Sequence, residues 1–233
     1  MDRPRTRLRF RRVAFAARVF ELPMSQKQSA NSEGRAAVGF RAHSGWTAFV
    51  ILVGSPRSLV VLDRGRIELV ERDARWFKQP YHAAAGMDLK DAEEFLKRCA
   101  SASRLLARRA IRQLSNDLRK KGHALSACGI VLGSGRPLPP LASTLKSHAL
   151  IHTAEGILFR EALVRASKDC KLPVCGVAER ELYSRAATEL HSSEAVLRKR
   201  LGEMGKAIGP PWRQDEKHAA LTAWMALAGA GVD

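Results

Sequence analysis

The stretch Ala36–Leu52, AAVGFRAHSGWTAFVIL, decides the fold. Its first half alternates apolar residues with small or polar ones, with Val38 and Phe40 on the same side, which is the period of a half-buried strand. A His-Ser-Gly tripeptide at 43–45 supplies turn residues. The mostly apolar run at 46–53 is typical of a buried strand. We therefore expect two strands joined by a tight turn.

The rest of the chain alternates strands and helices. A second turn, GSPR at 54–57, leads into a further strand or hairpin within 58–71. A long amphipathic helical pattern runs from Asp88 to Gly122. Short apolar strands are expected at 127–132 and 172–177, with a mostly apolar helix between them at 143–169. Successive parallel strands need such crossover helices, so the later part of the sheet is expected to be parallel.

The chain closes on Pro210–Ala228, PPWRQDEKHAALTAWMALA, which predicts a helix from about 214 to 228 with acidic residues at its start. This ending and the opening hairpin resemble the ribonuclease H-like fold, and most of all its branch of RuvC-type Holliday-junction resolvases. The resemblance covers residues 36–230. It implies an α/β fold with a mixed sheet, in which three antiparallel strands precede alternating helices and strands.

The resemblance also implies where catalytic metals would bind. The family holds two Mg²⁺ or Mn²⁺ ions with carboxylates on the first strand, at the end of the fourth strand and at the start of the last helix. The first position falls on Arg41, and the second falls near Leu132 or Gly133. In the last helix Asp215 is kept, and His218 stands in place of the second acid. We therefore expect no cofactor and no two-metal centre, with Asp215 and His218 as the remaining catalytic candidates.

Arg41 has two interpretations. Its guanidinium could bind a phosphate where the family binds a metal, because its planar fork matches phosphate oxygens. Alternatively it forms a structural ion pair with Asp215, since two part-buried charges facing one cleft need partners. We favour the ion pair.

The composition favours a nucleic-acid partner, DNA or RNA. The net charge is +17 and the pI is about 10.6, a field that attracts polyanions. Seven arginines lie in residues 1–24 against only Asp2 and Glu21. Residues 1–35 end in a polar, aperiodic stretch, so we expect a basic disordered arm, followed by one domain at 36–233. The true start of the protein is hypothesised to be Met24.

Backbone contacts are expected from Arg41 and from two further basic residues. Arg136 follows the glycines of the loop GSGR at 133–136, and Lys146 lies at the start of the next helix. Aromatic residues make up only 6% of the chain, which gives little support for base stacking.

A second cluster is expected on the helix at 143–169. His148, His152 and Glu155 are spaced by four and three residues, so they share one helical face. Two histidines and a carboxylate can bind Zn²⁺. Leu145, Gly156 and Phe159 share that face, which favours a packed interface with buried, hydrogen-bonded histidines over a metal site. His43, in the first turn, could join this cluster or the Asp215–His218 pair.

Other features limit the alternatives. Four cysteines without a CxxC pair argue against a zinc ribbon and fit a reducing, cytoplasmic setting. No apolar run is long enough to span a membrane. A homodimer is one possibility, because RuvC-type enzymes are dimers. Three functions stay open: a nucleic-acid-binding protein without nuclease activity, a nuclease with a rebuilt metal site, and a protein-interaction domain of the same fold.

Overall fold

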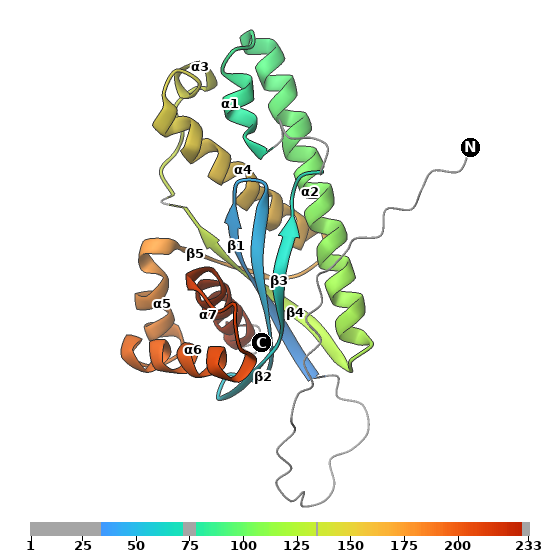
Figure 1. Ribbon diagram of the computed structural model, residues 1–233, viewed down its shortest axis with the longest axis vertical. Helices are drawn as coiled ribbons and strands as arrows, with labels where there is room; N and C mark the ends of the chain where they lie inside the picture. The colour runs from blue at the N-terminus through green and yellow to red at the C-terminus, as the bar shows by residue number, and fades with distance from the viewer. Residues whose placement is uncertain (1–33, 72–77, 134, 230–233) are drawn as a thin grey trace, which may run out of the picture. The chain divides into compact units, whose positions relative to one another are not determined.

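The computed structural model describes residues 34–71, 78–133 and 135–229 (Figure 1). Most of the predicted arm lies outside these residues, and the first strand begins at Gly34, two residues before the expected boundary. The elements are β1 Gly34–His43, β2 Trp46–Ser55, β3 Ser58–Glu68, α1 Pro80–Ala84, α2 Leu89–Arg119, β4 His123–Leu132, α3 Leu141–Thr144, α4 His148–Asp169, β5 Val174–Ala178, η2 Glu179–Glu181, α5 Leu182–Glu189, α6 Glu194–Ile208 and α7 Gln214–Gly229.

The five described strands form one sheet in the order β3-β2-β1-β4-β5. The first three strands pair antiparallel. β4 pairs parallel with β1, and β5 pairs parallel with β4. This order and these directions confirm the predicted fold class, a ribonuclease H-like mixed sheet.

Helices cover both faces of the sheet (Figure 1). α2 and α4 pack on one face against Val38, Phe40 and their neighbours on β2 and β4. α5, α6 and α7 pack on the other face, where Ala37 and the alternate residues of the same strands point. The alternation read from the sequence therefore divides one strand between two apolar layers.

Two glycines let α7 lie close to the centre of the sheet. Gly39 and Gly129 are paired across β1 and β4. A Cβ at Gly39 would lie 1.7 Å from the carbonyl oxygen of Ala219, and one at Gly129 would lie 2.1 Å from that of Thr222. Only glycine fits at these positions, because a real Cβ contact this short does not occur.

The helix predicted at 143–169 is divided. α3 ends at Thr144, and Ser147 takes an extended backbone before α4 begins at His148. The final helix runs from Gln214 to Gly229, within one residue of its predicted end. Among the described residues, no helix is both long and apolar enough to cross a membrane.

The four cysteines are free. Burial raises the pKa of the Cys99 thiol to about 11 and that of the Cys128 thiol to about 12. Burial also raises the pKa of Cys170 and Cys175. All four are therefore protonated at neutral pH, which removes them as thiolate nucleophiles.

Candidate functional site

Charged residues gather where β1 and β5 end under the start of α7. Gly39 faces α7, so the alternation of β1 places Arg41 on that same face of the sheet. The Arg41 Nη2 donates to both carboxylate oxygens of Glu179, each at 2.9 Å. Glu179 follows β5 directly. The side chain of Arg41 is only 18% exposed but that of Glu179 is 44% exposed, so the carboxylate end of this pair is open to solvent.

The predicted ion pair between Arg41 and Asp215 is wrong, because Arg41 pairs with Glu179. An Oδ2 of Asp215 lies 3.0 Å from Nε2 of His43 instead. The parallel pairing of β5 to β4 brings the carboxyl end of β5 to the edge of the sheet where Arg41 lies. Glu179, which follows β5, is therefore close enough to pair with Arg41. Arg41 and Asp215 do share one site, as expected, and His43 joins the Asp215 side of it.

His218 lies one turn after Asp215 on α7 and is 5% exposed. Its Nδ1 has no hydrogen-bond partner in the described structure, and the nearest carboxylate oxygen, on Glu179, is 3.8 Å away. Burial lowers the pKa of His218, Glu179 acts to raise it, and Arg41 acts to lower it. The desolvation outweighs the nearby carboxylates, so His218 is held neutral.

A second arginine enters the site from the opposite layer. Arg160 on α4 lies against the carboxyl end of β4, where a Cβ at Gly133 would be 2.7 Å from its Nη2. A Cβ at Gly156 would meet the same nitrogen at 2.7 Å, so two glycines make room for this guanidinium. Burial lowers the pKa of Arg160, the charge of Arg41 lowers it further, and Glu179 opposes both.

The guanidinium of Arg160 makes no hydrogen bond or ion pair with another described residue, although it is partly desolvated and lies near the like charge of Arg41. The Nε of Arg41 is also buried without a hydrogen-bond partner in the described structure. Arg41 is hydrogen-bonded to Glu179, and the guanidinium of Arg160 interacts with that carboxylate only through its charge. Arginine donors in this state are suited to bind an anion.

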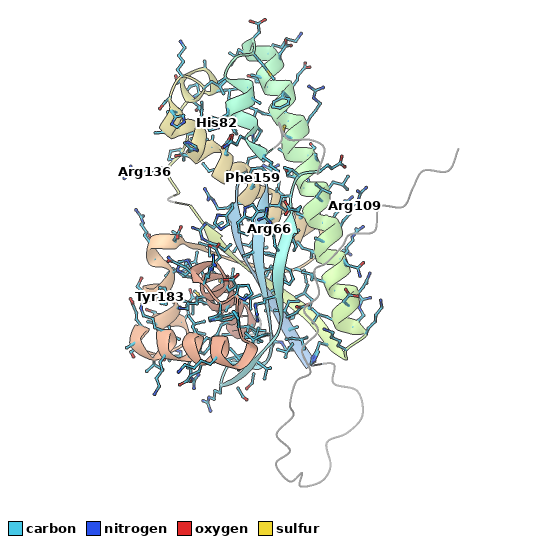
Figure 2. The ribbon with its side chains drawn as sticks, in the orientation of Figure 1. Arg66, His82, Arg109, Arg136, Phe159 and Tyr183 are labelled. Carbon is cyan, nitrogen blue, oxygen red and sulfur yellow. The ribbon has the colours of Figure 1, made fainter. Side chains whose placement is uncertain are left out.

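Aromatic stacking holds the hairpin beside the site. The rings of His43 and Trp46 stack at 4.2 Å, and the guanidinium of Arg66 lies 4.0 Å from the Trp46 ring centroid. Figure 2 shows Arg66 on the sheet, in the part of the molecule below α4. The stack fixes the ring of His43 in its contact with Asp215.

A hollow of about 760 Å³ opens next to His218. α5, α6 and α7 surround it, and the Arg198 guanidinium lies 3.6 Å from the Tyr183 ring centroid at its wall. Its charged lining residues include Glu179, Arg180, Glu194, Arg198 and Lys217. The hollow therefore continues from the arginine site into a polar surface of mixed charge.

Arg136 and Lys146, predicted to contact a nucleic-acid backbone, are both exposed. Arg136 lies in the segment between β4 and α3, and Figure 2 shows it at the outer side of the molecule. Neither side chain makes a hydrogen bond or an ion pair to another described residue. The structure therefore leaves both in reach of solvent, outside the cluster around Arg41.

Of the three predicted metal ligands on α4, His148 and His152 lie together, whereas Glu155 is not part of their group. His82 from α1 joins His148 and His152, and one ligand nitrogen from each lies within 4.8 Å of the others. Glu155 is fully buried, and its Oε1 lies 2.9 Å from Nδ1 of His82. Glu155 thus contacts a histidine that the sequence reasoning did not include.

Three residues of these clusters were missed from the sequence. Glu179 could have been found as the first acid after a parallel strand. Arg160 and the adjacent Glu161 are the two charged residues in the apolar helical stretch 156–164, and Arg160 lies one turn after Gly156. His82 lies in a segment that reads as irregular, so nothing in the sequence associates it with α4.

No protein-family model matches the chain, and no curated protein matches it. Among solved structures, the chain is similar to Thermus thermophilus RuvC in complex with a Holliday junction substrate, with a TM-score of 0.47 and 9% identity over 84% of this chain and 95% of that one. A structure of Thermus thermophilus RuvC gives a TM-score of 0.45 at the same identity and coverage. At this identity the likeness concerns the fold alone.

Proposed function

We propose that this chain is a nucleic-acid-binding, RuvC-related protein that binds phosphates through Arg41 and Arg160 and does not cleave the phosphodiester backbone. The observation that carries the proposal is the state of Arg160. It is a partly buried guanidinium without a hydrogen bond to another described residue, and Arg41 repels it. A phosphate would supply the negative charge and the acceptor oxygens that the protein lacks there.

The residues at this site do not fit two Mg²⁺ or Mn²⁺ ions. Such a centre needs three or four carboxylates with free oxygens. The residues described here offer Glu179, bound at both oxygens by Arg41, and Asp215, in contact with His43. Glu216 is engaged at its helix start, where its Oε2 accepts a hydrogen bond from the Arg213 backbone N–H at 2.7 Å. Two guanidinium groups beside this set repel a cation.

The net charge supports the same partner class. Outside residues 1–24 the chain keeps a net charge of +12, since those residues account for +5 of the +17. Exposed Arg136 and Lys146 are proposed as additional backbone contacts on the route out of the site. Contacts of this kind give affinity for DNA and RNA alike and do not select a sequence.

The test uses the full chain and fluorescent single-stranded, duplex and four-way-junction probes of DNA and RNA, at two salt concentrations, with Mg²⁺ or EDTA. We expect salt-dependent binding and no cleavage. Arg41→Met and Arg160→Met should each weaken binding by about 10-fold and reduce the salt slope by about 0.9. Arg165→Met is the matched control, because Arg165 is an exposed arginine of the same helix, paired with Glu161.

The other outcomes are equally informative. Metal-dependent cleavage that is lost in Asp215→Asn would overturn the non-cleaving part and indicate a rebuilt nuclease centre that uses Asp215 and His218. Binding that is equal in both arginine variants and in the control would place the contact elsewhere. The absence of nucleic-acid binding would overturn the proposal and favour a protein partner.

A further inference from the structure

The histidines at the junction of α1 and α4 form a cluster separate from the arginine site. His148 and His152 are one turn apart at the start of α4, and His82 comes from α1. The ring centroids of His148 and His152 are 4.5 Å apart, and that of His82 is 5.3 Å and 4.8 Å from them. Figure 2 shows His82 between the two helices. Residues 66 positions or more apart in the chain thus converge on one point.

A buried carboxylate orients one of these rings. Glu155 Oε1 lies 2.9 Å from Nδ1 of His82 and accepts a second hydrogen bond from the backbone N–H of His82 at 3.3 Å. With Nδ1 donating to the carboxylate, the lone pair of His82 is on Nε2. A carboxylate behind a histidine is the arrangement that fixes the tautomer of metal-bound imidazoles and raises their basicity.

The charge of Glu155 is incompletely balanced. Its side chain is 1% exposed, and its Oε2 has no hydrogen-bond partner in the described structure. A buried carboxylate needs positive charge nearby. Glu155 lies two turns inside α4, too far from its start for the helix dipole to supply this charge, and a cation held by the three rings would supply it.

We propose that His82, His148 and His152 bind a Zn²⁺ ion, with Glu155 as the carboxylate that positions His82. Three imidazole ligands with one further position suit tetrahedral Zn²⁺, in which the Zn–N distance is about 2.0–2.1 Å and neighbouring nitrogens are about 3.4 Å apart. The ligand nitrogens here lie within 4.8 Å of one another. His148 and His152 are exposed, so small rotations of their rings complete the geometry.

The fourth position faces solvent, because two of the three ligands are exposed. It would carry water or an external ligand. The ion would also link α1 to α4, whereas the apolar contact of Ala84 on α1 is with Ala92 and Leu96 on α2. The site is therefore expected to stabilise this part of the fold as well as to hold a metal. It does not depend on the proposed nucleic-acid binding.

The experiment is a zinc titration of the untagged full chain in competition with a chromophoric chelator, together with the absorption spectrum of the Co²⁺ form. We expect one equivalent of Zn²⁺ per chain and the visible bands of four-coordinate Co²⁺. The double variant His148→Gln, His152→Gln should lose at least 100-fold in affinity. Glu155→Gln should lose about 10- to 100-fold, because it keeps the three ligands and removes only the positioning charge.

His191→Asn is the control, since His191 is an exposed histidine in the turn between α5 and α6. It should bind Zn²⁺ as the parent does. Circular dichroism in EDTA checks that the double variant is folded, as expected for two exposed positions. Zinc binding that is unchanged in the folded double variant, or a parent chain without a stoichiometric site, would overturn the proposal.

Discussion

α4 contributes to two polar clusters that differ in the group left incomplete. In its first half, Glu155 is a buried carboxylate with one unpaired oxygen, and its other oxygen contacts the imidazole of His82. One turn later, Arg160 is a partly buried guanidinium beside Arg41, and Glu179 is the carboxylate near them. The first cluster lacks positive charge and the second lacks negative charge. The comparison teaches that the unbalanced buried group, more than the fold, indicates which kind of ligand a site can take.

The largest effect is expected from Gly129→Ala, which would damage one cluster and spare the other. The new Cβ would lie 2.1 Å from the Thr222 carbonyl oxygen, so α7 would have to move from the sheet. We expect the free energy of unfolding in urea to fall by about 3 kcal/mol. Nucleic-acid binding should weaken, because Gly129 is paired with Gly39 on β1, two residues before Arg41, and a displaced α7 would disturb that strand end. Zinc binding at α1 and α4, on the opposite face, should survive.

Gly202→Ala is the matched control for this change. Gly202 lies within α6, and a Cβ there meets no atom within 4 Å. Alanine in a helix interior should stabilise the protein by about 0.5–1 kcal/mol. If Gly129→Ala lost zinc and nucleic acid to the same extent while still folded, the two clusters would not be independent.

Glu155→Gln sharpens the comparison through a dependence on zinc. In EDTA the variant should differ from the parent by about 1 kcal/mol or less, since it removes a buried charge and introduces an unpaired amide. In excess Zn²⁺ it should be less stable than the parent by about a further 1.4–2.7 kcal/mol. This is the 10- to 100-fold loss of zinc affinity expressed as a free energy. Thermal melts in both conditions measure the difference. An equal difference with and without Zn²⁺ would contradict the role of Glu155.

Arg160→Met tests whether Arg160 lowers the folding stability of the protein while it strengthens nucleic-acid binding. Replacing a partly buried, repelled guanidinium by an apolar side chain should leave the free energy of unfolding unchanged or raise it by about 1 kcal/mol. Nucleic-acid affinity should fall in the same variant. Arg165→Met, which breaks an exposed pair with Glu161, should change stability by less than about 0.5 kcal/mol. A large loss of stability in Arg160→Met would show that Arg160 has a structural role instead.

The fold could be predicted from the sequence because its signals are local. The alternation around Val38 and Phe40 and the order of strands and crossover helices were sufficient to define the sheet. Arg41 and Asp215 could be placed in one site, since strand ends and helix starts meet at predictable edges, whereas His43 was left open between this site and the histidine cluster on α4. Glu179 as the partner of Arg41 could not, because the choice between two nearby carboxylates depends on side-chain reach.

The contact of His82 with the histidines of α4 could not be predicted from the sequence, for a different reason. α1 is only five residues long, so no sequence period indicates which face it presents. The position of Arg160 could not be predicted either, because its guanidinium occupies space that is free only since residues 133 and 156 are glycines. Contacts between residues far apart in the chain that depend on the lack of a side chain at a glycine produce no recognisable pattern in a single sequence.

The smallest effect concerns the pH dependence that His218 adds to the arginine site. Burial lowers the pKa of His218 below its ordinary value of 6.5, against the opposing charges of Glu179 and Asp215. As pH falls below 6.5, the unfolded chain takes up this proton before the folded chain does. The stabilising contribution of neutral His218 is therefore complete above pH 6.5 and is lost as the pH falls toward its folded pKa. In His218→Gln, the fall in the free energy of unfolding between pH 7 and pH 5 should be smaller than in the parent, whereas His191→Asn should keep the parent's slope. Urea titrations at several pH values give both slopes, and equal slopes in His218→Gln and the parent would mean that His218 is not held neutral by its burial.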